Sequence, residues 1–135
     1  MQQADELSNL LATLKLKQEM LADKHGRYVP LALKIAPDLD AHQIQEVADR
    51  LVKHQIDAVI ATNTTLSRVG VEHHKHGAEA GGLSGAPVRA KSTSVIRDLA
   101  AALKGEVPII GVGGIESGDD AVEKNPRRRY AGPAL

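Results

Sequence analysis

Hydrophobic residues recur with a helical period in several segments of the chain. The first stripe predicts a helix that ends near residues 24–26, and it consists of Leu7, Leu10, Leu11, Leu14 and Leu21. A second helix is predicted after Asp40, an N-cap residue with Gln43 in the position that completes a capping box. Its apolar stripe is Ile44, Val47, Ala48, Leu51 and Val52.

A third helix and a short fourth one are predicted in the second half of the chain. The third stripe is Val95, Ile96, Leu99 and Leu103. Gly105 is expected to end this helix, and Ser117, three residues before Asp120, is expected to cap the last one.

Short apolar runs between these helices predict β-strands. They cover residues 30–36, 58–61 and 108–112. Alternation of strands with helices favours right-handed crossovers and a parallel sheet, so the predicted fold class is α/β. Three parallel strands leave two open edges, whereas a closed barrel has eight strands, so we expect part of a larger fold.

Composition narrows the classes of partner. Of the 135 residues, 42% are hydrophobic and 25% charged, which is typical of a folded domain. Seventeen basic residues balance 17 acidic ones, which argues against a nucleic-acid partner. The chain contains no cysteine, which excludes disulfides, thiolate metal sites and a cysteine nucleophile. No apolar run approaches the roughly 20 residues that a membrane helix needs.

Unusual residues fall where parallel α/β folds place their working groups, at the C-terminal ends of strands. Lys34 lies in an apolar strand, where an unpaired ammonium is costly, so we expect a polar or anionic partner; a structural ion pair is the alternative. Residues 62–65, Thr-Asn-Thr-Thr, offer hydroxyls and an amide, or form a turn or cap. Glycines in residues 81–85 and 111–114 let backbone N–H groups approach a phosphate or a flat ring, or simply form turns.

A long segment, about residues 66–91, is rich in glycine and histidine and has no clear period. Connections of this length are often functional or mobile. His73, His74 and His76 raise the hypothesis of a metal site, but the segment is polar and its ligands poorly fixed, so we predict a solvated loop and no metal. Residues 127–129 are three arginines that either bind a polyanion or, as we favour, remain solvated.

Several blocks taken together resemble the quinone-linked (class 2) dihydroorotate dehydrogenases. The blocks are residues 34–39 (KIAPDL), 56–65 (IDAVIATNTT), 81–85 (GGLSG) with 91–93 (KST), and 108–115 (PIIGVGGI). Their order and spacing match from about Gln3 to Lys124. That family is an FMN-containing (β/α)8 barrel that oxidises dihydroorotate to orotate in pyrimidine (UMP) synthesis and reduces quinone.

The resemblance divides the chain into two parts. It implies that residues 1–124 are part of an FMN-binding (β/α)8 TIM barrel, three parallel strands with their helices. Residues 125–135 diverge from the family and are low in strand-forming residues. We expect this tail to be disordered, and it looks like the product of a shifted reading frame, a hypothesis that resequencing the coding DNA tests.

Carried over residue by residue, the resemblance implies a cofactor site. Lys34 and Thr62 resemble residues that contact the flavin, and a cation at Lys34 would stabilise negative charge on the reduced ring. Gly85 and Gly114 resemble positions where the backbone approaches FMN, Gly114 on its phosphate side.

The resemblance also implies a substrate site without a base. Asn63 and Thr64 resemble the pair that hydrogen-bonds the orotate ring. The serine base of the family lies upstream of every matching block, so we assign no catalytic residue and expect no turnover from these residues alone. The family is peripheral to the membrane, on the cytoplasmic face of the inner membrane in bacteria. Its membrane-docking helices have no match here, so we expect this chain to be cytoplasmic if expressed alone.

Two alternatives to this enzyme remain open. One is a non-catalytic truncated or frameshifted fragment that self-associates through its open sheet edges. The other is a different phosphate-binding TIM-barrel enzyme, such as another flavoenzyme or an isomerase, which the Thr-Asn-Thr-Thr cluster disfavours.

Overall fold

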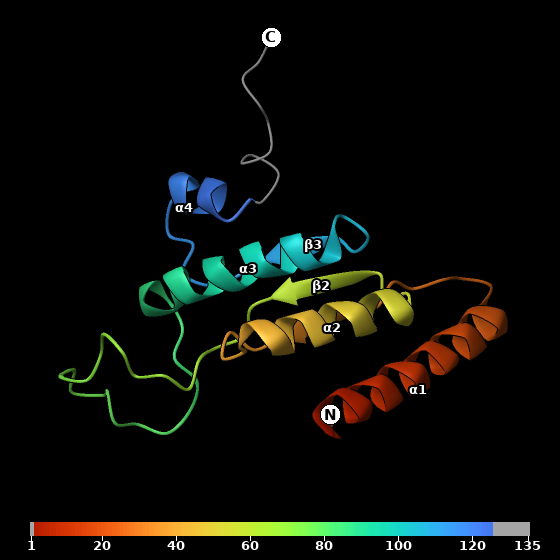
Figure 1. Cartoon of the computed structure of the whole chain (residues 1–135), viewed down its shortest axis with the longest axis horizontal. Coiled ribbons are helices and arrows are strands. Elements are labelled where there is room, and N and C mark those ends of the chain that lie inside the picture. Colours follow the sequence, from red (N-terminus) through yellow and green to blue (C-terminus); the bar gives the residue numbers. More distant parts are fainter. Residues whose placement is uncertain (1, 126–135) are drawn as a thin grey trace, which may run out of the picture.

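A computed structural model of the chain describes the backbone of residues 2–125 and the side chains of residues 5–125. In chain order the elements are α1 (Gln2–His25), β1 (Ala32–Ile35), α2 (Ala41–Lys53), β2 (Ala58–Ala61), the 3-10 turn η1 (Ala86–Val88), α3 (Arg89–Leu103), β3 (Ile109–Gly111) and α4 (Gly118–Glu123). The strands form one parallel sheet in the order β1-β2-β3 (Figure 1). The predicted α/β class and parallel sheet are confirmed. The predicted tail lies almost wholly outside the described residues, as do all three arginines of residues 127–129.

Among residues 2–125, helices cover only one face of the sheet. Helices α2 and α3 pack against each other, and Figure 1 shows them side by side in front of the strands. Strand residues that contribute to this core are Leu33, Ile35, Val59, Ala61 and Ile109. The opposite face carries the cross-strand row Lys34, Ile60 and Ile110, and Ile110 is 49% exposed. This uncovered face is the one that points inward when such strands close into a barrel.

Helix α1 packs on α2 through a narrower strip than its leucine pattern predicts. Leu11 is fully buried, and Leu7 packs against the core. Leu10 and Leu21 are 52% and 43% exposed, because α1 contacts α2 along the side that carries Leu11. The predicted helix is confirmed, and two members of its leucine stripe lie largely in solvent.

A carboxylate at the N-terminal edge of the sheet fixes the connection from α1 to β1. Asp57 accepts hydrogen bonds from the Tyr28 hydroxyl (2.5 Å), the Leu31 backbone N–H (2.7 Å) and the Gln18 amide (3.1 Å). Partial burial would raise the pKa of Asp57, but these hydrogen bonds outweigh it and lower the pKa. The cluster lies at the end of the strands where barrel folds concentrate stability rather than ligand binding.

Both predicted helix caps are confirmed. Asp40 accepts from the Gln43 backbone N–H (2.8 Å), and the Gln43 side chain accepts from the Asp40 N–H (3.0 Å). Ser117 caps α4 by accepting from the Asp120 N–H at 3.2 Å. These local signals therefore define where α2 and α4 begin.

Helix α3 begins earlier than predicted. The long segment was expected to reach about residue 91, but η1 and the first turn of α3 occupy residues 86–91. The apolar period is hidden because Ser92 and Thr93 are buried polar residues in this first part of the helix. The Ser92 hydroxyl donates to the Val112 carbonyl at 2.6 Å, which satisfies it inside the core.

None of the helices among residues 2–125 combines the length and apolar character that crossing a membrane requires.

Candidate functional site at the C-terminal edge of the sheet

The predicted site residues gather where the three strands end. Thr62 and Asn63 follow β2 directly and are fixed by both neighbouring strand ends. The Thr62 N–H donates to the Val112 carbonyl (2.9 Å), and the Asn63 N–H donates to the Ile35 carbonyl (2.7 Å). Because Ile35 ends β1 and Val112 follows β3, these two bonds bring the ends of all three strands together around Thr62 and Asn63, as expected for a parallel sheet. Lys34 directly precedes Ile35 on β1.

Thr62 carries a polar atom that the described residues leave unsatisfied. Its side chain is 2% exposed, and its Oγ1 has no hydrogen-bond partner among residues 5–125. Burying a hydroxyl without a partner costs about 1–3 kcal/mol. A ligand that hydrogen-bonds to this hydroxyl would remove that cost, which fits the predicted role of Thr62 in contacting a cofactor.

Asn63 and Thr64 differ from Thr62 in being exposed. An amide offers both donors and an acceptor, and a hydroxyl offers one donor and two acceptor sites. Side chains of this kind at the ends of strands can recognise a small planar molecule that carries carbonyl and N–H groups. The substrate role of this pair stays a prediction.

The two predicted cofactor glycines lie against each other. Gly114 is buried with a φ of 66°, and a Cβ built on it would lie 2.8 Å from the Gly85 carbonyl oxygen. The same Cβ would lie 2.6 Å from the Arg89 Cβ, in the first turn of α3. A residue with a side chain cannot occupy this place without displacing the backbone. Gly114 therefore lets the turn after β3 pack directly against Gly85 and the first turn of α3, and the cofactor role of the two glycines stays a prediction.

The expectation that Lys34 is buried is wrong for the described chain. Its side chain is exposed, because the sheet face that it shares with Ile60 and Ile110 is uncovered. Among the described residues it therefore avoids the desolvation that was expected to require an anionic partner. Its ammonium instead projects from the face that would line a barrel interior.

Asp38 is a site residue that the sequence analysis missed. Its Oδ1 accepts from the Thr65 hydroxyl at 2.6 Å and from the Lys91 ammonium, and its Oδ2 accepts from the Leu66 N–H at 3.0 Å. Partial burial would raise the pKa of Asp38, but the hydrogen bonds from Lys91, Thr65 and Leu66 lower it to about 2. The signal in the sequence was an acid two residues beyond the end of the first apolar run, directly after Pro37.

A second polar cluster holds α4 to the first turn of α3. Asp120 accepts from the Arg89 guanidinium (2.5 Å) and from the Glu116 N–H (3.0 Å). Lys124, only 4% exposed, donates to the Arg89 carbonyl (3.2 Å) and to the Thr93 hydroxyl (3.1 Å). Burial lowers the pKa of the Lys124 ammonium. The cluster therefore fixes Arg89, whose Cα and Cβ lie against Gly114.

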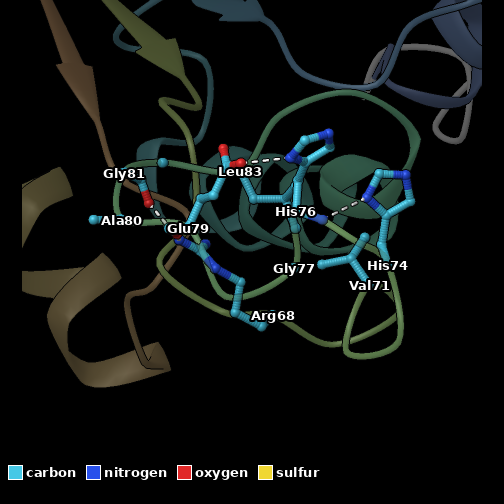
Figure 2. Close-up of a pocket in the computed structure, with 10 residues that line it drawn as sticks. Arg68, Val71, His74, His76, Gly77, Glu79, Ala80, Gly81 and Leu83 are labelled. Atoms are coloured by element: carbon cyan, nitrogen blue, oxygen red, sulfur yellow. Dashed lines mark hydrogen bonds and ion pairs between the residues drawn. The ribbon is translucent and has the colours of Figure 1, made fainter.

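The loop between β2 and α3 encloses a hollow of about 340 Å³ (Figure 2). Its lining comes from Arg68, Val71, His74, His76, Gly77, Glu79, Ala80, Gly81, Gly82 and Leu83. The Arg68 guanidinium crosses the loop and donates to the Glu79 and Gly81 carbonyls, both at 2.7 Å. Gly81 and Gly82 of the candidate glycine run line this hollow, but none of the cofactor or substrate residues that the resemblance implies does, so we place the candidate site at the sheet edge instead.

The histidines of this loop interact with their own neighbours. The His76 ring nitrogen Nδ1 lies 2.5 Å from the Glu79 carboxylate, and the His74 Nδ1 accepts from the His76 N–H at 3.2 Å. Across the described part of the chain, no group of three or more potential ligand residues is arranged to hold a metal ion.

Comparison with known proteins gives a consistent result. The family model for dihydroorotate dehydrogenase matches residues 1–126. The dihydroorotate dehydrogenase (quinone) of Chromobacterium violaceum is 67% identical over 124 residues, which are 92% of this chain and 36% of that protein. The protein of the same name from Dechloromonas aromatica is 60% identical over the same shares of the two chains. The crystal structure of DHODH from Eimeria tenella in complex with ferulenol matches with a TM-score of 0.84 at 32% identity, covering 91% of this chain and 36% of that one.

Proposed function

The chain belongs to the dihydroorotate dehydrogenase family, in its quinone-linked class, and from that premise we propose that it forms part of the FMN and substrate sites of such an enzyme. Its three strands are part of a (β/α)8 barrel. The proposed reaction oxidises dihydroorotate to orotate in pyrimidine synthesis, with quinone as the final electron acceptor. The observation that carries the proposal is the unsatisfied Thr62 hydroxyl beside exposed Asn63 and Thr64 at the C-terminal edge of the sheet.

One feature of the described residues fits a bound FMN. Thr62 offers a buried hydroxyl that needs a hydrogen-bond partner, and the resemblance adds the backbone of Gly85 and Gly114. A bound FMN would supply the acceptor for the two electrons that leave the substrate ring. The Lys34 ammonium would stabilise negative charge on the reduced flavin, and the glycine backbone would receive the phosphate end.

Asn63 and Thr64 would orient the substrate. Orotate is planar and carries carbonyl, N–H and carboxylate groups, which match the donors and acceptors of an amide and a hydroxyl. Fixing the ring in one orientation lowers the entropic cost of the reaction, since the reacting atoms are already aligned. The proton-abstracting serine that the resemblance implies has no counterpart in these 135 residues, so we expect them to bind ligands without turnover.

Orotate binding to the FMN-loaded chain tests this proposal. We expect saturable orotate binding, with a Kd that rises about tenfold in Asn63→Ala because a ring hydrogen bond is lost. Asn9→Ala, which removes an exposed amide on α1, is the matched control and should leave the Kd unchanged. A folded chain that binds FMN but shows no orotate binding, or an equal loss in both variants, would exclude the substrate role.

Self-association is a second property that one observation favours. The uncovered sheet face exposes Ile110, and β1 and β3 each leave an edge of the sheet unpaired among the described residues. We propose that the isolated 135-residue chain associates with further copies through this face. Light scattering coupled to size-exclusion chromatography should give the wild-type chain a molar mass above that of one chain, and Ile110→Lys should lower it. A wild-type chain that elutes as a monomer argues against association.

The family also bears on location. We propose that the whole protein is peripheral to a membrane, as the resemblance implies, and that the residues described here take part in ligand binding rather than membrane contact.

A further inference from the structure

We propose that Asp38 is a positioning residue for the substrate pair Asn63 and Thr64, because it fixes the segment that follows them. The inference rests on the proposed function, since it assigns a role toward the same substrate. Asp38 itself contacts neither member of the pair through a hydrogen bond; it acts through Thr65 and Leu66.

One carboxylate oxygen of Asp38 accepts a hydrogen bond from a side chain, and the other accepts one from the backbone. Oδ1 accepts from the Thr65 hydroxyl (2.6 Å), and Oδ2 accepts from the Leu66 N–H (3.0 Å). The Thr65 hydroxyl also accepts from the Ser67 N–H at 3.0 Å, which extends the network one residue further. Because Thr65 is 3% exposed, little water competes for its hydroxyl.

The pair is fixed on its other side by the sheet. The Thr62 and Asn63 N–H groups donate to the Val112 and Ile35 carbonyls, respectively. These two bonds fix the backbone of the segment before Thr64 against the strand ends. The backbone leaves the pair at Thr65, where Asp38 binds it. Asn63 and Thr64 therefore lie between a backbone anchor at the sheet and a second anchor at Thr65, and only the anchor at Thr65 depends on the Asp38 side chain.

The returning end of the loop adds a contact to Thr64 itself. Thr65 and Leu83 exchange two backbone hydrogen bonds, of 3.0 Å and 2.8 Å. This bridge brings Gly82 so close to Thr64 that a Cβ on Gly82 would lie 1.9 Å from the Thr64 Oγ1. The direction of the Thr64 side chain thus depends on the Thr65–Leu83 bridge, and the bridge is fixed at Thr65 by Asp38.

Lys91 completes what we call the Asp38 clamp, formed by Asp38, Thr65, Leu66 and Lys91. Its ammonium binds Asp38 Oδ1 from the first turns of α3, so the carboxylate joins the β1–α2 connection, the start of the loop and α3. Hydrogen bonds with a charged partner are roughly twice as strong as neutral ones. The clamp therefore resists displacement of the loop base more than a neutral side chain would.

Asp38→Ala in the 135-residue chain tests the inference through two independent measurements. Orotate Kd should rise about tenfold, because one charged hydrogen-bond network is lost. FMN Kd should stay within about twofold, because Thr62, Gly85 and Gly114 keep their own anchors. In hydrogen–deuterium exchange, the Leu66 and Leu83 amides should lose about tenfold in protection, while amides in the middle of α3 stay unchanged.

Asp49→Ala is the matched control, since it removes the same charged group from the exposed side of α2 and should move neither quantity. Where Asp38→Ala fails to fold, as seen by circular dichroism, Thr65→Val provides a second variant. It removes the Thr65–Asp38 hydrogen bond and the one from the Ser67 N–H but keeps the Leu66 and Lys91 contacts, so it should show the same pattern to a smaller degree. Equal losses of FMN and orotate affinity, or unchanged Leu66 and Leu83 protection, would overturn the positioning role. A wild-type chain that binds no orotate contradicts the proposed function instead, and the exchange data then decide separately whether the clamp holds the loop.

Discussion

The hydroxyl of Thr62 connects local structure to the proposed ligand binding at the scale of single residues. It is buried directly after the end of β2, yet it has no hydrogen-bond partner among the described residues. A polar group that destabilises the free chain is retained where a ligand uses it. Stability and ligand affinity should therefore respond in opposite directions to its removal.

Thr62→Val separates these two effects. Valine keeps the volume and deletes the hydroxyl, so the free energy of unfolding should stay equal or rise by up to about 1–2 kcal/mol. FMN affinity should fall about fivefold, the value of one hydrogen bond of about 1 kcal/mol. Urea denaturation and flavin fluorescence measure the two quantities. A variant that is clearly destabilised and binds FMN as wild type does would contradict the assignment.

Asp38 gives the chain a defined response to acid. Its pKa in the folded chain, about 2, lies below the ordinary value of 3.8, so its contribution to stability is complete above the ordinary pKa and is lost as the pH falls through about 2. The pKa values of Asp57 and Asp120 are lowered too, so the total loss exceeds the share of Asp38.

Comparison of wild type with Asp38→Ala isolates the contribution of Asp38 to the pH dependence of stability. The difference in unfolding free energy should be constant above about pH 4 and shrink toward zero near pH 2. Urea unfolding at successive pH values measures it. A difference that does not change with pH would mean that the carboxylate charge is not what stabilises the loop base.

At the scale of elements, the packing of the start of α3 depends on a close contact between three backbone segments. Gly114, Gly85 and Arg89 meet where β3 turns toward α4, and Lys124 binds the Arg89 carbonyl from behind. Any side chain at position 114 would have to displace both a carbonyl and a helix turn. The glycine is therefore needed for the packing of these elements.

Gly114→Ala should destabilise the chain by about 2–4 kcal/mol, because the added methyl clashes with backbone and a φ of 66° disfavours alanine. Gly118→Ala is the matched control, since a Cβ there meets nothing within 4 Å and its position in α4 accepts alanine well. Thermal unfolding compares the two variants. Similar melting temperatures for both would show that the backbone can move aside at Gly114.

Local signals in the sequence predicted the helices and strands better than they predicted the loop between β2 and α3. The capping box at Asp40 and the apolar run 58–61 identified α2 and β2, because both depend on neighbouring residues. The segment from Leu66 onward showed no period, because its order comes from Asp38, Arg68 and Leu83, which contact residues distant in the chain. Such contacts require the folded sheet and leave no local pattern to find.

At the scale of the whole molecule, the uncovered sheet face explains why the expectation for Lys34 was wrong. Lys34 was expected to be buried, and its side chain is exposed on the sheet face opposite α2 and α3. The chain spans 36% of the length of its quinone-linked relatives, so the sequence carries a pattern suited to a larger barrel than its own residues can build. The blocks that carry the family resemblance identified the candidate site, whereas burial depends on the remainder of the barrel.

FMN titration of the purified 135-residue chain, followed by flavin fluorescence, tests the central claim most directly. Saturable binding that weakens about tenfold in Lys34→Ala and stays unchanged in Lys17→Ala, a matched change of charge on α1, would show that these residues hold part of a flavin site. A folded chain that binds no FMN, or that loses affinity equally in both variants, would contradict the account.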